Sequence, residues 1–337
     1  MINVGIVGAS GYTGLELVKM LVTHPKFHLK YLATTTGDTV IEALHPSLVD
    51  VITFPVEVAS IESVVEHCEL VFLALPHKAS MGFAKDLIAQ GVKVVDLSAD
   101  YRLELNTYES IYCEHEDKEN LDKAVYALIE YYREELKETK LVAGPGCYPT
   151  ATLLGILPFI PYLDEKAPLF VDAKSGLSGA GKRLSETSHF VNINENMFAY
   201  SPLRHRHGAE IAEKIEKVQG VKLNVNFVPH LIPVTRGELV SVYGTLNLKD
   251  DIDPIEVLKK HYENDPFIRI RENPVELKSV VGTHFCDIYA SKNENGLFVS
   301  AVIDNLLRGA SSQALVAGNL MCGLSEGMGI PTIAYVP

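Results

Sequence analysis

The segment 145–151 places a single cysteine where it could act as a nucleophile. Cys147 follows a Pro-Gly pair and precedes an apolar run, 153–157, that predicts a helix, so the cysteine would lie at or just before the helix N-terminus. The unpaired N–H groups and the positive dipole end there favour a thiolate, and such settings lower a thiol pKa from about 8.5 to about 3.5–7.5. A thiolate attacks acyl carbon atoms. The alternative is a buried, inert cysteine, because free cysteines are often buried.

A second candidate site lies near the N-terminus. Gly8, Gly11 and Gly14 have the spacing G-x-x-G-x-x-G, after an apolar strand at 2–8 and before residues with helical periodicity. Glycines there allow a pyrophosphate to approach the helix start closely, although a glycine-rich turn that binds nothing is the alternative. Where NAD-binding domains usually carry an acidic residue, this chain has Thr34-Thr35-Thr36. Because nothing there would repel a 2′-phosphate, NADP is the favoured cofactor.

Histidines and basic residues form a third group of candidates. His205 and His207 could act as acid or base, and the neighbouring Arg204 and Arg206 could hold phosphate or carboxylate. The alternative for this cluster is a basic surface turn. The segment 229–237 is a second candidate because it also contains a histidine and an arginine, and its alternative is a rigid turn before a strand. Further candidate anion contacts are Arg102, Lys182 and Arg183.

Together these residues fit the reduction of an acyl group. Cys147 would attack an acyl phosphate, expel phosphate and form a thioester. Hydride from NADPH would then reduce the thioester to an aldehyde. The arginines would hold the phosphate and a substrate carboxylate, while a histidine moves the proton.

The elements that position these residues suggest two domains. Apolar strands at 70–75 and 92–97 alternate with helices, which predicts a Rossmann-type α/β domain with a parallel sheet. From about residue 150 the pattern changes to longer, partly alternating strands with few helices, which predicts an α+β domain with a mainly antiparallel sheet. We predict an NADP-binding domain at 1–146 with a returning C-terminal segment, 305–337, and a catalytic domain at 147–304. The longer strands are expected at 169–174, 223–228, 239–248, 283–291 and 297–303, and a last helix at 310–324.

The composition of the chain limits the classes of binding partner that we expect. The net charge of -13 argues against nucleic acid and anionic membranes. No apolar run reaches about 18 residues, which argues against a membrane span. Five scattered cysteines without a CxxC pair argue against disulfides and structural zinc, and favour the cytoplasm. The pair His24 and His28 has a zinc-like spacing, but Pro25 ends the helix between them, so no metal is expected.

Ordered motifs along nearly the whole chain resemble one family. They are Gly8–Gly14, Ala74-Leu75-Pro76-His77, Asp96–Arg102, Pro145–Ala151, Lys174–Gly181, His205-Arg206-His207-x-x-Glu210, Pro229–Gly237 and Asp304-Asn305-Leu306. The chain resembles the N-acetyl-gamma-glutamyl-phosphate reductases of arginine biosynthesis, within the semialdehyde dehydrogenase superfamily. Aspartate-semialdehyde dehydrogenases are similar in fold and thiol chemistry but lack two of these motifs.

The resemblance implies NADPH-dependent reduction of N-acetyl-L-glutamyl 5-phosphate to the 5-semialdehyde, with Cys147 as the nucleophile. It implies cofactor contacts from both domains, a phosphate contact at Arg102, acid–base catalysis by His205 or His207 rather than His230, and a homodimer or homotetramer formed through the second domain. The expected cofactor contacts are Gly8, Ser10, Gly11, Tyr12, Thr13, Gly14, Thr35, Ser98, Ser178, Gly179 and Asn305, and the expected substrate contacts are Arg102, Lys182, Arg204 and Arg206. Alternatives are a carrier-linked aminoadipyl-phosphate reductase of lysine biosynthesis and a non-catalytic NADP-binding protein.

Overall fold

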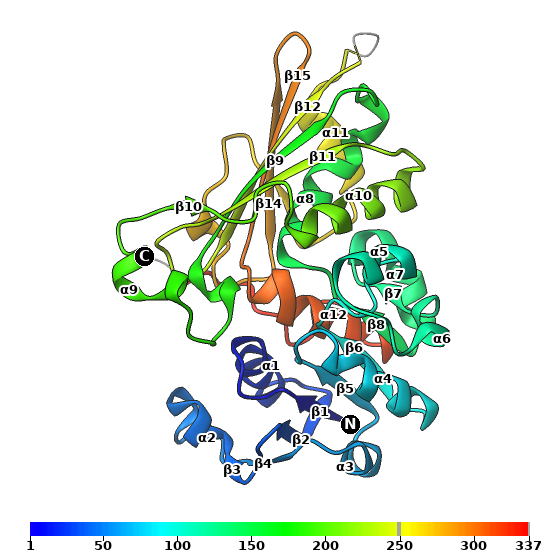
Figure 1. Ribbon diagram of the computed structural model, residues 1–337, viewed down its shortest axis with the longest axis vertical. Helices are drawn as coiled ribbons and strands as arrows, with labels where there is room; N and C mark the ends of the chain where they lie inside the picture. Colours follow the sequence, from blue (N-terminus) through cyan, green and yellow to red (C-terminus); the bar gives the residue numbers. More distant parts are fainter. Residues whose placement is uncertain (248–250, 336–337) are drawn as a thin grey trace. The chain divides into compact units, whose positions relative to one another are not determined.

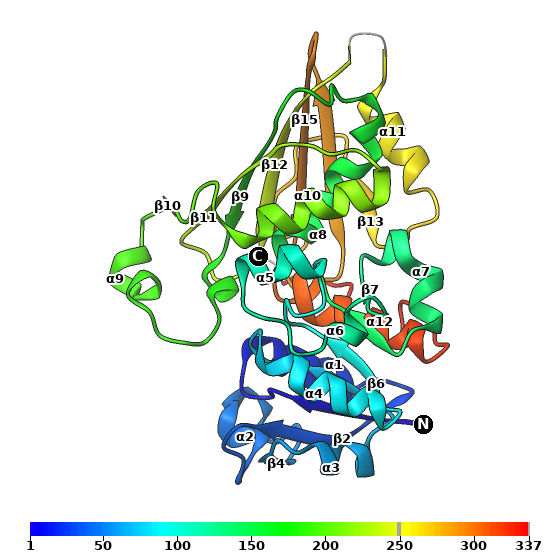
Figure 2. The ribbon, with the colours of Figure 1, turned by 45° about the vertical axis from the view of Figure 1, so that its right-hand side comes forward.

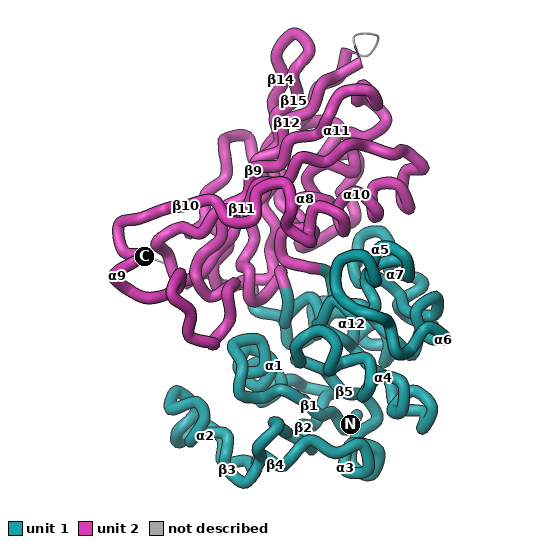
Figure 3. The backbone as a smooth tube through the Cα atoms, viewed as in Figure 1, with its two compact units in different colours: residues 1–145, 310–331 teal, residues 146–309, 332–337 magenta. Residues whose placement is uncertain are grey.

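The computed structural model describes residues 1–247 and 251–335. The chain forms two compact units (Figure 3). Unit 1 comprises Met1–Pro145 and Ala310–Pro331, and unit 2 comprises Gly146–Gly309 and the residues after Pro331.

Unit 1 is built on an eight-stranded sheet in the order β3-β4-β2-β1-β5-β6-β8-β7 (Figure 1). The strands from β4 to β7 run parallel, as predicted, and β3 adds one antiparallel pairing with β4 at the edge. Both edge strands are short, and neither carries the apolar run by which the central strands were predicted. The strands are β1 Ile2–Val7, β2 Phe27–Thr34, β3 Thr39–Val40, β4 Pro55–Val58, β5 Leu70–Leu73, β6 Lys93–Asp96, β7 Val125–Tyr126 and β8 Leu141–Ala143.

Helices cover both faces of this sheet (Figure 2), which explains why its central strand β5 is apolar throughout. Val71 and Leu73 of β5 pack with Met81 on one face, while Leu70 and Phe72 lie beside Gly318 on the other. The helices are α1 Tyr12–Val22, α2 Ile41–Leu44, α3 Ile61–His67, α4 Ala79–Ala89, α5 Leu105–Ile111, α6 Lys118–Leu121, α7 Ile129–Glu138 and α12 Ser312–Met321, with a 3-10 turn η1 Pro46–Leu48.

Unit 2 contains a seven-stranded sheet in the order β10-β11-β9-β12-β15-β14-β13. Two strand pairs, β11 with β9 and β13 with β14, are parallel and the other four are antiparallel, as the mainly antiparallel prediction required. The strands are β9 Leu169–Ser175, β10 Phe198–Ala199, β11 Val225–Leu231, β12 Glu238–Thr245, β13 Ile268–Ile270, β14 Cys286–Lys292 and β15 Gly296–Ile303.

Helix α8 packs on β12 and β15, and α10 packs on α8 and β11. On the opposite face, the neighbouring side chains of Phe170 and Tyr243 are 51% and 47% exposed. The helices are α8 Cys147–Ile156, α9 Phe190–Ile193, α10 Arg206–Gln219 and α11 Pro254–His261, with short turns η2 Leu157–Tyr162, η3 Leu177–Ala180, η4 Glu186–Ser188 and η5 Leu277–Ser279, and a π-helical turn η6 Leu307–Ser311.

Two sequence predictions need correction. The strand expected at 223–228 begins at Val225 and continues to Leu231, so Pro229 and His230 lie within β11 rather than in a turn. The Pro229 carbonyl accepts the Tyr200 N–H at 3.0 Å, so its missing N–H faces the same side, where β10 pairs only with His230 and Leu231 and no ladder bond is lost. The last helix begins at Ser312 rather than at residue 310, because the π-helical turn η6 precedes it.

Candidate active site

Cys147 is the first residue of α8, and Gly146 is its N-cap. The backbone around it is held on both sides. The Gly146 N–H donates to Oε1 of Glu210 at 2.9 Å, and the Gly146 carbonyl accepts from the N–H of Thr150 at 2.9 Å. Because no acidic residue lies in the first turn of α8, the helix dipole favours a thiolate at Cys147.

Cys147 lines a cavity of about 410 Å³ within unit 2. Of the predicted site residues, the cavity brings together Cys147, Gly179, His205, Arg206 and His207. The other lining residues are Tyr148, Ser175, Ala180, Thr187, Phe198, Tyr200 and Leu231. A nucleophile, two imidazoles and a guanidinium group therefore face one space that is large enough for a small acyl compound.

His205 is the N-cap of α10, where its Nδ1 accepts the N–H of His207 at 3.2 Å. A ring nitrogen that accepts carries no proton, so neutral His205 has its proton on Nε2. Burial, followed by the positive charge of Arg206, lowers the pKa of His205 to about 4. At neutral pH His205 is thus a neutral hydrogen-bond donor.

His207 lies closer to the backbone of the nucleophile. A Cβ atom added to Gly146 would be 2.7 Å from Nε2 of His207, so the imidazole packs directly against the residue before Cys147. The rings of His205 and His207 meet edge to face, with centroids 4.7 Å apart. The first turn of α10 therefore places both imidazoles near the start of α8.

Two tyrosines complete one wall of the cavity. The Tyr200 hydroxyl donates to the Tyr148 hydroxyl at 3.1 Å, which in turn donates to the His230 carbonyl at 3.3 Å. Burial raises the pKa of both phenols, so they stay protonated. The His230 ring instead lies 3.2 Å from Asp172 and is not among the lining residues.

The predicted cofactor contacts in unit 2 form one hydrogen-bonded group. Asn305 donates through Nδ2 to Oγ of Ser178 at 2.9 Å and accepts through Oδ1 from the Gly237 N–H at 2.8 Å. These two bonds fix the orientation of the amide. A Cβ atom on Gly179 would lie 2.9 Å from Oγ of Ser175, so glycine is needed for the close packing of this loop.

The predicted anion contacts are dispersed. Arg206 lines the cavity, whereas Arg204 and Lys182 are exposed and are absent from its lining. Arg102 belongs to unit 1, where it is buried and donates to the carbonyls of Gly144 at 2.6 Å and Leu97 at 2.9 Å. Those bonds hold its guanidinium group at the carboxyl ends of β6 and β8.

The glycine turn of unit 1 has the geometry that a pyrophosphate needs. Gly8 has φ +103°, and a Cβ atom there would lie 2.2 Å from the Ala74 carbonyl oxygen. A Cβ atom on Gly14 would lie 2.4 Å from the Gly8 oxygen. Because Gly11 is the N-cap of α1, no side chain competes with an anion for the first N–H groups. Ser10, Tyr12 and Thr13 lie in this turn or in the first turn of α1.

The two remaining predicted cofactor contacts, Thr35 and Ser98, differ in whether their hydroxyl groups already have hydrogen-bond partners. Thr35 is exposed directly after β2, where NAD-binding domains usually carry an acidic residue. The Ser98 hydroxyl already donates to Asp96 at 2.7 Å and accepts from the Asp100 N–H at 3.0 Å. Ser98 therefore positions its own loop through its hydroxyl, and burial raises the pKa of Asp96 to about 6.

Within residues 1–247 and 251–335, no cluster of three or more His, Cys, Asp or Glu side chains could hold a metal ion. His24 stacks on Phe27 and hydrogen-bonds to Asn319. Among those same residues, no helix is both long and apolar enough to span a membrane.

Sequence reasoning missed two carboxyl groups as site residues. Glu210 lies three residues after His207 on α10 and could have been found from that spacing. Glu238, the first residue of β12, lies beside Cys147 but gives no signal in the sequence.

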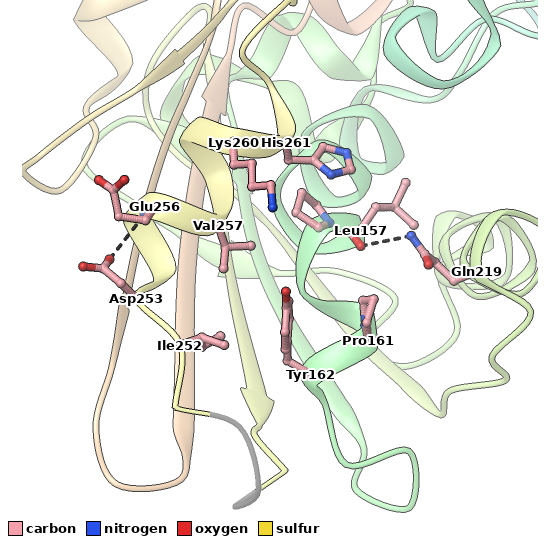
Figure 4. A pocket seen from close by; sticks show the side chains of 11 residues that line it. Leu157, Pro161, Tyr162, Gln219, Ile252, Asp253, Glu256, Val257, Lys260 and His261 are labelled. Carbon is pink, nitrogen blue, oxygen red and sulfur yellow. Dashed lines mark hydrogen bonds between the residues drawn. The ribbon is translucent and has the colours of Figure 1, made fainter.

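Unit 2 also has a second, open cavity of about 610 Å³. Figure 4 shows it between η2 and α11, where Gln219 donates to the Leu157 carbonyl at 3.2 Å. None of the predicted site residues lines it.

Comparison with protein families matches both parts of the chain. Residues 3–139 match the semialdehyde dehydrogenase NAD binding domain, and residues 147–305 match the semialdehyde dehydrogenase dimerisation domain. An N-acetyl-gamma-glutamyl-phosphate reductase of Sulfurovum sp. (strain NBC37-1) is 77% identical, with 100% of each chain covered. The reductase of Wolinella succinogenes is 60% identical, covering 100% of this chain and 99% of the relative. That of Aquifex aeolicus is 41% identical, covering 100% and 99%.

Solved structures agree on the fold. Aspartate semialdehyde dehydrogenase II of Vibrio cholerae, complexed with ASA, has a TM-score of 0.73 at 16% identity, covering 96% of this chain and 98% of that one. The Candida albicans aspartate semialdehyde dehydrogenase with NADP has a TM-score of 0.69 at 13% identity, covering 97% and 99%. The predicted fold class, reductase class and nicotinamide cofactor are confirmed. The chain belongs to the N-acetyl-gamma-glutamyl-phosphate reductase family of the semialdehyde dehydrogenases.

Proposed function

We propose that this chain catalyses the NADPH-dependent reduction of N-acetyl-L-glutamyl 5-phosphate to N-acetyl-L-glutamate 5-semialdehyde, with release of phosphate, in arginine biosynthesis. The observation that carries the proposal is Cys147 at the first position of α8, in one cavity with His205, Arg206 and His207. Full-length relatives at 77% and 60% identity carry that reductase name.

Cys147 acts as the nucleophile. Its thiolate forms a bond to the acyl carbon, and the carbon–oxygen bond to phosphate breaks, which leaves a thioester on the enzyme. NADPH, when bound, supplies the hydride that reduces this acyl group. The carbon–sulfur bond then breaks, releasing the aldehyde and restoring the thiolate.

His207 is the proposed acid–base residue. A proton must reach the leaving phosphate oxygen in the reductive direction, and an imidazolium is the usual donor. His205, with its pKa at about 4, is seldom an imidazolium near neutral pH. Its Nδ1 holds the N–H of His207, so His205 orients the first turn of α10 and offers its Nε2 proton as a hydrogen bond.

The anionic groups of the substrate need positive partners. Arg206 lines the cavity and is the proposed partner of the substrate carboxylate or phosphate. Arg102, Arg204 and Lys182 remain proposed anion contacts. Cofactor contacts are proposed at the 8–14 turn, Thr35, Ser98, Ser178, Gly179 and Asn305. The uncapped start of α1 supports a pyrophosphate at that turn, and the threonines after β2 support NADP over NAD.

Assembly and location complete the proposal. The match of 147–305 to a dimerisation domain indicates a homo-oligomer, and we propose a dimer or tetramer. Exposed aromatic side chains on the sheet of unit 2 support an interface there, because an exposed apolar patch often marks a protein contact. The ring of Tyr243 packs on the ring of Phe298, with centroids 5.4 Å apart, and Tyr243 pairs with exposed Phe170 on the neighbouring strand. We also propose a cytoplasmic enzyme with no nucleic acid or membrane partner, from the net charge of -13 and the scattered cysteines.

The reverse reaction tests the chemistry. The protein is mixed with N-acetylglutamate semialdehyde, NADP and phosphate, and NADPH absorbance is followed. We expect NADPH to form only with phosphate present and not with Cys147→Ser. Activity that survives in Cys147→Ser would refute the thioester mechanism. Activity only with a carrier-bound aminoadipate semialdehyde would move the enzyme to lysine biosynthesis, and NADPH binding without turnover of any aldehyde would indicate a non-catalytic protein.

A further inference from the structure

Glu238 is a fully buried carboxyl group beside the nucleophile. As the first residue of β12 it pairs with Ser175 of β9 and Ile303 of β15. The side chain is 0% exposed, and neither carboxyl oxygen has a nitrogen or oxygen partner in the described part of the chain. Such a group is costly to bury, so its presence requires an explanation.

The Cys147 side chain is a neighbour of this carboxyl and favours its charged form. The other titratable groups that interact with it electrostatically are the phenols of Tyr148, on α8, and Tyr200, ahead of α10. On its own strand segment, Arg236 is ion-paired with Asp304 at 3.0 Å. Burial raises the pKa of Glu238 to about 8, and the interaction with Cys147 offsets only part of that rise.

The position of Glu238 separates it from the substrate. Cys147 lines the 410 Å³ cavity, and Glu238 does not. Gly309 packs against Cys147, and Ile303, the β15 partner of Glu238, lies beside Gly309, so these residues form the buried surroundings of the nucleophile. Glu238 can therefore influence the reaction through Cys147, which makes it a positioning residue.

We propose that Glu238 and Cys147 form a coupled pair that holds one proton, in which the Glu238 carboxylate takes the thiol proton and keeps Cys147 as a thiolate. The S–H bond breaks and an O–H bond forms, so the pair carries one negative charge before and after the transfer. The inference deepens the proposed function, because it rests on Cys147 being the nucleophile.

The protonated, neutral form of Glu238 has two consequences for catalysis. Its O–H donates to the thiolate sulfur, which stabilises the nucleophile and later the same sulfur as a leaving group. It also removes a second negative charge from beside the cavity. A carboxylate there would repel the acyl phosphate dianion, whereas a carboxylic acid does not.

The pH dependence of Cys147 alkylation tests the pair without substrate. The full chain is titrated with iodoacetamide, Cys147 is followed by peptide mass, and Cys147→Ser gives the background from other cysteines. Because coupled groups titrate in two macroscopic steps, the wild type should show two steps in alkylation rate. Glu238→Gln should show one step, with full reactivity reached about one pH unit or more lower, because the carboxylate charge is gone.

Two further variants control the experiment. Glu238→Met has a similar length and no charge, and it should also give one step, so the test survives if Glu238→Gln fails to fold. Asp287→Asn removes another buried carboxyl, on β14, which pairs with Arg269 of β13, and this variant should keep two steps. His205 and His207 are present in every variant, so their titration does not explain a difference.

An alkylation profile that is the same in wild type, Glu238→Gln and Glu238→Met would overturn the coupled pair. This result would be separate from a failure of the proposed function, because alkylation needs neither acyl phosphate nor NADPH. Loss of the second step in both Glu238 variants would support the pair, whichever aldehyde the enzyme turns over.

Discussion

Gly309→Ala should displace the nucleophile while leaving the chain folded. A Cβ atom at Gly309 would lie 2.7 Å from Cβ and 3.2 Å from Cα of Cys147. Ordinary contacts begin at 3.4 Å, so one side must move by 3.4 − 2.7 = 0.7 Å. Cys147 cannot yield cheaply, since the preceding Gly146 is fixed by two hydrogen bonds: its N–H donates to Glu210, and its carbonyl accepts from the Thr150 N–H. Overpacking of this kind costs about 1–3 kcal/mol, and a 1 Å error at a reacting group costs about 100-fold in rate.

The expected result for Gly309→Ala is therefore a fall in kcat of about 10- to 100-fold, with NADPH binding unchanged. Gly82→Ala is the matched control, because a Cβ atom there meets nothing within 4 Å on α4. That control should keep full activity and gain about 0.5–1 kcal/mol in stability. Turnover, thermal unfolding and Cys147 alkylation are measured on both. A folded Gly309→Ala enzyme with kcat within about twofold of wild type would refute the reasoning.

Three further predictions follow from single contacts. Glu210→Ala leaves the buried Gly146 N–H without its acceptor and should cost about 1–3 kcal/mol in unfolding free energy, whereas Glu210→Gln keeps an acceptor and most of the stability, as urea titration would measure. Burial lowers the pKa of His205 from 6.5 to about 4, so as the pH falls from 6.5 to 4 the unfolded chain takes up a proton that the folded chain does not, and the free energy of unfolding decreases. His205→Gln should remove up to about 3 kcal/mol of that decrease. Equal slopes of unfolding free energy against pH in the variant and the wild type would contradict this. Thr35→Asp places a charge where a 2′-phosphate is expected and should raise KM for NADPH about tenfold or more with little change for NADH, and an unchanged ratio would remove Thr35 from the cofactor site.

The parts of the fold that the sequence predicted are those with strong local signals. The apolar strands β1, β5 and β6 and the glycine turn after β1 carry patterns that local physics determines. The edge strands β3 and β10 have two residues each, and only pairing with a neighbour defines them. The π-helical turn η6 was missed because five residues of mixed type, Leu307–Ser311, carry no periodic signal of their own.

The residues of the candidate site also differ in how strong a signal they give in the local sequence. Cys147 and the 205–207 cluster could be predicted because residue type and spacing carry the chemistry, and the structure places them around one cavity. Arg102 shows the limit of that reasoning, since its guanidinium group donates to two backbone carbonyls of its own unit, which no spacing could reveal. Glu238 is the stronger example. It begins an apolar strand 91 residues after Cys147, and only the pairing of β12 with β9 and β15 brings it under α8.

Glu210 and Glu238 give one cysteine two different carboxyl neighbours. Glu210 accepts the N–H of Gly146 and so holds the backbone in place. Glu238 has no such donor in the described chain, so burial makes its neutral form competitive near physiological pH. The same functional group can therefore fix geometry at one position and store a proton at the other, because the two carboxyl groups have different partners. It follows that exchanging the two roles by mutation is not conservative: an amide can replace Glu210 as an acceptor, but no amide can take the proton of Cys147 in place of Glu238.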